Sequence, residues 1–155
     1  MDLLSHEDHG QSTLARIIYV SRRSAGVSDD DVVELALRSS RRNRVYGVTG
    51  CLWFGDKQFF QILEGDRAVV DSLFTRIQLD ARNCAVRLLS NQAIITREFT
   101  RWALTHIVDQ EQQTIDKLLE HYLGRRNLAS QPPLLPRFDA FKAIDRSVFP
   151  AAHHF

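Results

Sequence analysis

One polar side chain stands inside an apolar stretch near the middle of the chain. Gln61 lies within Phe59–Leu63, a run whose composition is typical of a strand buried on both faces. Its carboxamide has donors on the nitrogen and an acceptor on the oxygen, and such groups cost about 1–3 kcal/mol when they are buried without partners. Either the protein core or a bound ligand must therefore pair with Gln61.

Two further hydrogen-bonding side chains occur where a ligand could reach them. Tyr19 lies near the end of the β-branched run Leu14–Ser21, which predicts a strand. Asn43 follows a helix predicted from about Asp29 to Arg42, which Ser28 and Asp31 open as a variant capping box. One face of this helix changes from apolar to small and polar along Val32, Ala36, Ser39 and Asn43. Such a face suits a flat polar ligand.

Common catalytic and metal-binding signatures are absent from the sequence. It contains no GxSxG, P-loop, GxGxxG or HExxH motif. The histidines at the two ends of the chain are expected to be surface residues, and we predict no metal site. The acidic run Asp29–Asp31 is typical of a solvated helix start rather than a catalytic pair.

One feature invites a hydrolase as the alternative function. Ser21-Arg22-Arg23 follows the first predicted strand, and an arginine-bearing loop at that position also serves small ferredoxin-like hydrolases of phosphate esters or acyl phosphates. No Gly-rich phosphate cradle accompanies these arginines, so the feature is weak on its own.

The elements that must position these residues follow the order βαββαββ. The apolar segment Gly47–Gly65 predicts a hairpin at the centre of a sheet. A second helix, capped by Asp66, is expected to end near Asp80, and strands are predicted over Cys84–Ile95 and Phe99–Val108. The predicted fold class is a ferredoxin-like α+β sandwich, with two helices on one face of a five-stranded mixed sheet.

The remaining chain is expected to cover the second face of that sheet. Residues 1–13 are read as an N-terminal tail and residues 109–155 as a helical extension after a domain over 14–108. Within the extension, apolar stripes predict helices over Gln110–Leu123 and Arg137–Val148. The Pro-rich segment that starts at Gly124 is expected to be a non-helical loop.

Composition limits the class of protein. The chain has 155 residues, which suits one domain, and a formal net charge of +1, which argues against a nucleic-acid partner. Cys51 and Cys84 are interpreted as buried apolar residues of a protein in a reducing compartment. With no secretion signal and no apolar run long enough for a membrane span, we expect a cytoplasmic protein without a membrane partner.

Several motifs in order along residues 14 to 108 resemble the BLUF family, blue-light sensors that use FAD. They are IIYVS around Tyr19, SSRRN ending at Asn43, GVTGCL, FFQILEG around Gln61, RIQLDARN and REFTRW. Any one of these motifs is weak alone, whereas their order and spacing together are specific.

The resemblance implies a flavin site and a mechanism. The isoalloxazine ring of FAD is expected between the two helices, with Tyr19 and Gln61 at its edge and Asn43 bonded to its carbonyl and N3 edge. Transient transfer from the tyrosine to the photoexcited flavin is implied to let the glutamine rotate or tautomerise, which moves the absorption slightly to the red. Ser39 joins this candidate binding set, and FMN is an alternative cofactor.

This chain departs from the family pattern at several arginines and their neighbours. Arg42 stands where relatives often have His or Asn, and it could stack on the flavin or reach a phosphate. Arg82 matches the arginine of a D-x-R-H motif near the cofactor, but Asn83 replaces the histidine. Arg76 is a weaker candidate for a cofactor contact.

A further departure lies on the last strand. Relatives usually carry W-x-M, whereas this chain has Trp102-Ala103-Leu104, so Leu104 replaces a methionine that is implied to lie near the glutamine. Leucine fills a similar volume without a sulfur acceptor. Trp102 is either a core anchor of the strand or a neighbour of the flavin.

The leading hypothesis is therefore a blue-light photoreceptor without enzymatic turnover. The photoactive residues are predicted to be Tyr19, Gln61, Trp102 and Leu104. Signalling is expected through self-association and contact with a separate effector protein. Besides the hydrolase, the alternative is a photochemically silent interaction domain.

Overall fold

A computed structural model describes residues 13–129 of the chain, and side chains as far as Gly124. Its elements are β1 (Leu14–Arg23), α1 (Asp29–Val45), β2 (Thr49–Phe54), β3 (Gln58–Asp66), α2 (Arg67–Gln78), β4 (Asn83–Ala93), β5 (Trp102–His106) and α3 (Glu111–Ala129). This is the predicted order βαββαββ followed by a helix. Residues 1–12 of the predicted tail 1–13, and the predicted helix Arg137–Val148, lie outside the described residues.

The strands form one five-stranded mixed sheet in the order β4-β1-β3-β2-β5. Strand β1 pairs antiparallel with β3 and β4, β2 pairs antiparallel with β3, and β2 pairs parallel with β5. Strand β3 is the middle strand and is buried from Phe59 to Gly65, as its apolar composition predicts. The ferredoxin-like α+β fold class is confirmed.

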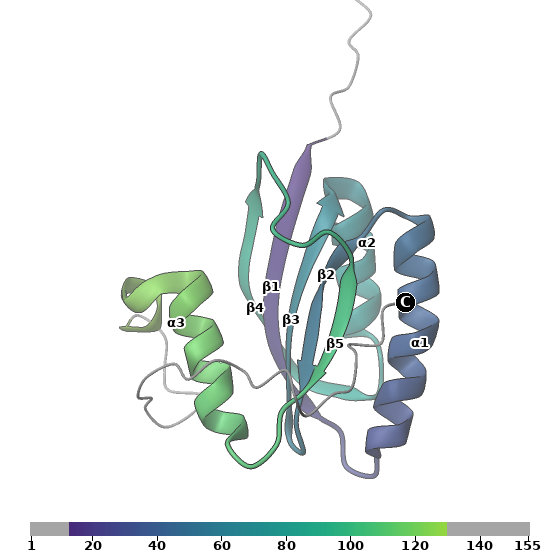
Figure 1. The fold of residues 1–155 in the computed structure, drawn as a ribbon, viewed down its shortest axis with the longest axis vertical. Coiled ribbons are helices and arrows are strands. Elements are labelled where there is room, and N and C mark those ends of the chain that lie inside the picture. Colours follow the sequence, from purple (N-terminus) through teal and green to yellow (C-terminus); the bar gives the residue numbers. More distant parts are fainter. Residues whose placement is uncertain (1–12, 130–155) are drawn as a thin grey trace, which may run out of the picture.

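The two faces of the sheet carry separate cores. On the side of α1 and α2, Ile17 and Leu63 pack with Val32 of α1 and Val70 of α2. On the other side α3 covers the sheet, and its buried residues Ile115 and Leu118 belong to a core with Ile18, Phe60 and Ile62. Figure 1 shows α3 on one side of the sheet and both crossover helices on the opposite side. The expectation that a helix after the last strand covers the second face is confirmed.

The helices begin at the residues that the sequence indicates. Ser28 and Asp31 form a reciprocal capping box at the start of α1, and Asp66 caps α2 by accepting from the backbone N–H of Ala68 at 2.9 Å. Helix α1 continues to Val45, three residues beyond the predicted end, so that Asn43 lies in its last turn rather than after it.

Gly50 lets β2 approach its neighbour closely. Its φ is 143°, and a Cβ at this position would lie 1.9 Å from the backbone oxygen of Ile62. Only glycine fits this conformation and this space. The glycine also aligns with Trp102 of β5 on one side and with Leu63 of β3 on the other.

A buried ion pair fixes the connection between β4 and β5. Glu64 of β3 is fully buried, and its carboxylate lies 2.6 Å from Nη2 of Arg16 on β1. The same carboxylate accepts from the backbone N–H groups of Glu98 and Phe99, at 2.9 and 3.0 Å. Phe99 in turn lies beside Trp53 of the sheet and Tyr122 of α3.

Two expectations about local structure are wrong. Gly124 interrupts α3 with a φ of 70°, but the chain is helical again as far as Ala129, so the non-helical loop does not start at Gly124. No proline occurs before Pro132, which allows these extra turns. Cys84 is exposed rather than buried, because it lies on the edge strand β4 next to a shift in the register with β1.

Candidate functional site

Tyr19 and Gln61 meet on the two central strands. They are directly opposite each other in the antiparallel pair β1–β3, and the Tyr19 hydroxyl donates a hydrogen bond to Oε1 of Gln61. Tyr19 is 2% exposed and Gln61 is 5% exposed. Because cross-strand partners share a face, both side chains point toward the layer of α1 and α2, and the core supplies a partner for the buried amide.

The Tyr19 phenol is held in its protonated form. Burial raises its pKa far above the ordinary value, and the negative charge of Asp80 adds to the effect. Its ring packs against Phe74 of α2, with 5.3 Å between the ring centroids. The hydroxyl is therefore a lasting hydrogen-bond donor at neutral pH, with Gln61 as its acceptor.

A row of side chains runs from this pair toward the edge of the sheet. Leu52 of β2 is the partner of Gln61 on one side and of Leu104 of β5 on the other. Leu52 is buried and Leu104 packs against the same core as Tyr19. Leu104 is therefore on the face predicted for it, with Leu52 between it and Gln61 in the row.

Asn43 connects α1 to the last strand. When its carboxamide nitrogen donates to the carbonyl oxygen of Ser39, its oxygen accepts from Nε1 of Trp102, each over 3.3 Å. Asn43 is 3% exposed and Trp102 is 4% exposed. The structure thus brings Asn43, Trp102 and the backbone of Ser39 together, whereas the Ser39 side chain is not among the groups that line the cavity beside Asn43.

A cavity of about 340 Å³ lies between α1 and α2, and Asn43 contributes to its wall. Its lining residues are Arg42, Asn43, Tyr46, Val48, Ala68, Val69, Ser72, Leu73 and Arg76. Small-molecule sites have this volume, mostly apolar walls and a few polar groups. The residues present therefore fit a flat ring system with a polar edge, and Val48 joins this cavity to the core that contains Tyr19.

Sequence reasoning found only part of this cavity. Arg42, Asn43 and Arg76 were candidates, while Tyr46, Ala68, Val69 and Ser72 were not. The α2 residues could have been found from their spacing, since Val69, Ser72 and Arg76 recur at three and four residues and lie beside the buried stripe of Val70 and Phe74.

Arg82 does not reach this cavity. Its guanidinium forms a two-pronged ion pair with Asp80, at 2.6 and 2.8 Å, and it lines a separate hollow beside Gly26 and Arg38. The pair lowers the pKa of Asp80. Asn83, which stands where relatives have histidine, accepts from the Ser21 hydroxyl at 2.9 Å.

Of the two arginines that suggested phosphate binding, Arg22 is exposed and Arg23 is held by structural contacts. Arg23 donates to the carbonyl oxygens of Val27 and Gly55, each at 2.9 Å, and pairs with Asp29 at 2.6 Å. Its side chain is 6% exposed. Strand β1 runs to Arg23 rather than ending at Ser21, so the arginines that suggested a hydrolase lie in the strand and not in a loop after it.

The family model of sensors of blue-light using FAD matches residues 14–105, which is more than half of the chain. The chain belongs to the BLUF family. The motif resemblance is confirmed over residues 14–105, and so is the function that it implied, a blue-light sensor with a flavin cofactor.

Known BLUF proteins agree in sequence and in fold. The photoactivated adenylate cyclase subunit beta of Euglena longa is 28% identical over 110 residues, which cover 70% of this chain and 13% of that protein. This chain therefore spans only a small part of that curated relative.

Two solved structures extend the likeness to the fold. The dark-state structure of the BLUF protein BlrB is 30% identical, with a TM-score of 0.61, and the match covers 76% of this chain and 91% of that one. BlrP1 of Klebsiella pneumoniae, solved with FMN and cyclic diGMP, is also 30% identical, with a TM-score of 0.57 over 69% of this chain and 30% of that one. Among the residues described here, no helix of the BLUF chain is long and apolar enough to cross a membrane.

Proposed function

We propose that FAD binds in the cavity between α1 and α2 and that Tyr19 and Gln61 are the photoactive pair of this BLUF domain. The observation that carries the proposal is the buried hydrogen bond from the Tyr19 hydroxyl to the Gln61 oxygen, on the face that the two helices cover. When bound, a flavin supplies absorption of blue light and, once excited, an acceptor for an electron and a proton.

The chemistry of this chain lies in the two ends of the Gln61 amide. In the observed arrangement the amide oxygen accepts from the Tyr19 hydroxyl, which leaves the amide nitrogen as a donor toward other groups. After rotation or tautomerisation of the amide, the Tyr19 hydroxyl would face a different group of Gln61. The group that Gln61 presents to the flavin ring would change with it. Light therefore alters a hydrogen-bond pattern and leaves the cofactor chemically unchanged, which is sensing without turnover.

The other candidate residues have different supporting roles. Asn43 supplies an amide at the wall of the cavity and is held by Trp102. Arg42 and Arg76 are exposed residues of the same wall, where their charges suit the phosphates of a flavin nucleotide. Ser39 acts through its backbone, Leu104 through packing in the cross-strand row, and Arg82 remains a prediction at a separate hollow.

The output is proposed to pass through protein contacts. We infer a sensor over residues 14–108, with the tail 1–13 and the extension 109–155 outside it, and α3 as the element that a partner meets. The expected partners are a second copy of the chain and an effector protein. Two free cysteines, Cys51 and Cys84, support a location in the reducing cytoplasm.

An absorption spectrum recorded before and after blue light tests the central proposal. We expect a yellow protein whose flavin peak moves to longer wavelength on illumination and returns in the dark. A colourless protein that cannot be reconstituted with FAD would contradict the cofactor assignment, whereas a yellow protein with no shift would support the silent interaction domain. Chromatography of the flavin released by denaturation distinguishes FAD from FMN.

The oligomer and its dependence on light need a separate measurement. Light scattering coupled to size-exclusion chromatography, in the dark and under blue light, reports the mass of the assembly. A mass equal to one chain in both conditions would contradict signalling through self-association.

A further inference from the structure

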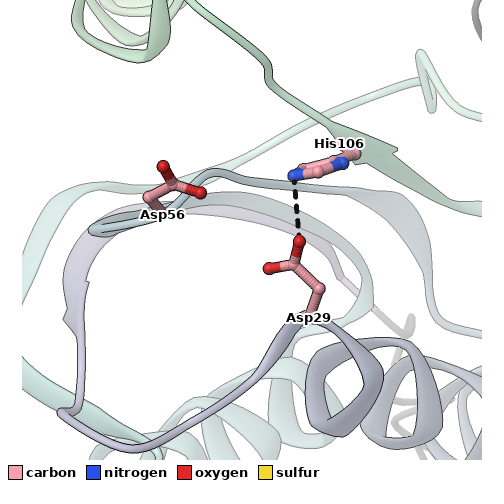
Figure 2. Close-up of side chains that lie close together, drawn as sticks. All are labelled: Asp29, Asp56 and His106. Carbon is pink, nitrogen blue, oxygen red and sulfur yellow. Dashed lines mark ion pairs between the residues drawn. The ribbon is translucent and has the colours of Figure 1, made fainter.

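Three side chains able to bind a metal converge at one end of the sheet, outside the cavity between α1 and α2. Asp29 is the first residue of α1, Asp56 lies in the turn between β2 and β3, and His106 is the last residue of β5. One ligand atom from each lies within 4.8 Å of the other two. Figure 2 shows the side chains approaching from three elements that are far apart in the sequence.

The surrounding residues hold these side chains in place. The His106 ring stacks on Phe54, with 4.5 Å between ring centroids and 10° between ring planes. Arg23 pairs with Oδ1 of Asp29 at 2.6 Å, and the other oxygen, Oδ2, lies 3.6 Å from Nε2 of His106. Arg23 also donates to the carbonyl oxygen of Gly55, which ties the turn to the start of α1.

The far side of the same turn is anchored independently. The Glu111 carboxylate at the start of α3 accepts from the backbone N–H groups of Lys57 and Gln58, at 3.0 and 2.7 Å. Asp56 therefore lies in a turn that is fixed on both sides, while its own side chain is exposed. The exposed Asp56 side chain can therefore rotate its carboxylate toward an ion at little cost, without any movement of the backbone.

The donor set favours a transition metal over magnesium or calcium. One imidazole nitrogen and two carboxylate oxygens are ligands of Zn²⁺ and of similar ions, whereas magnesium and calcium prefer oxygen alone. Tetrahedral ligands at about 2.1 Å from zinc are about 3.4 Å apart, so the exposed carboxylates must move inward by about 1 Å. Arg23 and the positive end of the α1 dipole weaken the attraction for a cation, which points to moderate affinity.

We propose that Asp29, Asp56 and His106 form a site for one divalent transition-metal ion such as Zn²⁺, with its remaining position open to water. This inference goes beyond light sensing and does not depend on the flavin. The ion joins the start of α1, the β2–β3 turn and the end of β5, just before the chain enters α3. Because the three residues meet only in the folded protein, a bound ion should stabilise the folded state over the unfolded state.

Calorimetric titration of the full-length chain with ZnCl₂ tests the site. We expect one ion per chain, and we expect His106→Gln and Asp56→Asn each to weaken binding by at least about tenfold. His121→Gln changes an exposed histidine of α3 and serves as the matched control. Replacing His6, His9, His153 and His154 together by Gln tests the terminal histidines, and binding should survive in both controls.

Two outcomes would overturn the proposal. One is a wild-type protein that takes up no Zn²⁺ at millimolar concentration. The other is zinc binding that persists in His106→Gln and Asp56→Asn but is lost with the terminal histidines. Circular dichroism of each variant reports whether it folds. If His106→Gln does not fold, the zinc affinity of Asp56→Asn, which changes an exposed residue of the turn, tests the site. Co²⁺ as a second probe should give visible ligand-field bands in the wild type that Asp56→Asn loses.

Discussion

The hydroxyl of Tyr19 donates to the amide oxygen of Gln61 across the two central strands of the sheet. The phenol and the amide are both neutral and both buried. The direction of their hydrogen bond fixes which end of the amide faces away from the tyrosine. The hydrogen bond is therefore the reference state from which a light-driven change is measured.

Replacing Tyr19 by Phe removes the donor and keeps the ring. We expect the flavin to remain bound and the light-induced red shift to disappear, with a loss of about 1–3 kcal/mol in stability from the unpaired amide. Light-minus-dark difference spectra check this. Tyr122→Phe makes the same change on the opposite face of the sheet and should keep the shift; a normal shift in Tyr19→Phe would rule the tyrosine out.

Asn43→Ala tests the cavity between α1 and α2. The variant removes the amide from the cavity wall and leaves Nε1 of Trp102 without this acceptor, so flavin affinity should fall by about tenfold or more. Titration of the apoprotein, followed by quenching of flavin fluorescence, gives the affinity. Arg44→Ala, an exposed neighbour on the same helix, should bind flavin like the wild type. If Asn43→Ala binds flavin as tightly as Arg44→Ala does, the flavin does not bind in the cavity between α1 and α2.

Gly50→Ala should be among the most damaging small substitutions in the sheet. A methyl group there meets the backbone oxygen of Ile62, which cannot retreat without breaking the β2–β3 pairing. We expect a loss of about 3 kcal/mol or more in urea unfolding. Gly26→Ala is the matched control, because Gly26 also has a positive φ but has no atom within 4 Å of the added group; about 1 kcal/mol is expected. Similar losses in both variants would mean that the cost comes from backbone strain at a positive φ and not from the close approach to Ile62.

Glu64 offers a way to separate charge from hydrogen bonding. Glu64→Ala leaves Arg16 and two backbone donors without their shared acceptor and should cost about 3–5 kcal/mol. Glu64→Gln keeps an acceptor for the backbone donors and should cost less. Chemical denaturation of both variants gives the two values. Glu34→Ala removes an exposed ion pair with Arg38 and should change stability by less than about 1 kcal/mol.

Asp116 predicts a pH dependence of stability. Partial burial raises the pKa of its carboxyl to about 6, although the hydrogen bond from the Gln112 amide opposes the shift. Since the folded-state pKa lies above the 3.8 of an unfolded aspartate, the native protein holds the proton more tightly, and stability falls as the pH rises through about 4 to 6. Asp116→Asn should therefore be more stable than the wild type at pH 7.5 by about 1 kcal/mol, allowing for solvent screening.

Thermal unfolding over a range of pH checks this prediction. The advantage of Asp116→Asn should shrink below pH 4, where the wild-type carboxyl is protonated in both states. Asp30→Asn makes the same substitution at an exposed residue of α1 and controls for the change of residue type. An advantage for Asp116→Asn that is constant with pH would contradict the assigned cause.

The sequence was informative wherever one residue broke a regular pattern. Gln61 within an apolar strand indicated a buried amide that needs a partner, and the structure supplies Tyr19. Helix starts were also predictable, because Ser28 and Asp66 cap through local hydrogen bonds that depend on neighbours in the sequence. The core face of α2 followed from its helical spacing.

Features that depend on distant contacts could not be read in this way. Cys84 was misplaced because register shifts on an edge strand leave no mark in the sequence. Arg82 was grouped with Asn43 by family resemblance; its ion pair with Asp80, two residues away, is local, but only the fold shows that the pair lines another hollow, and its cofactor contact stays a prediction. The cluster of Asp29, Asp56 and His106 was not predicted, because His106 joins the two aspartates only when the last strand pairs with β2.

Successive side chains of β3 point to opposite faces of the sheet, so that one strand contributes to both cores. Gln61 points to the helices α1 and α2, while its immediate neighbours Phe60 and Ile62 belong to the core beneath α3. The two compartments are separated by a single thickness of backbone. We therefore expect a rotation of the peptide unit at Gln61 to displace Phe60 and Ile62 and so to alter the packing beneath α3.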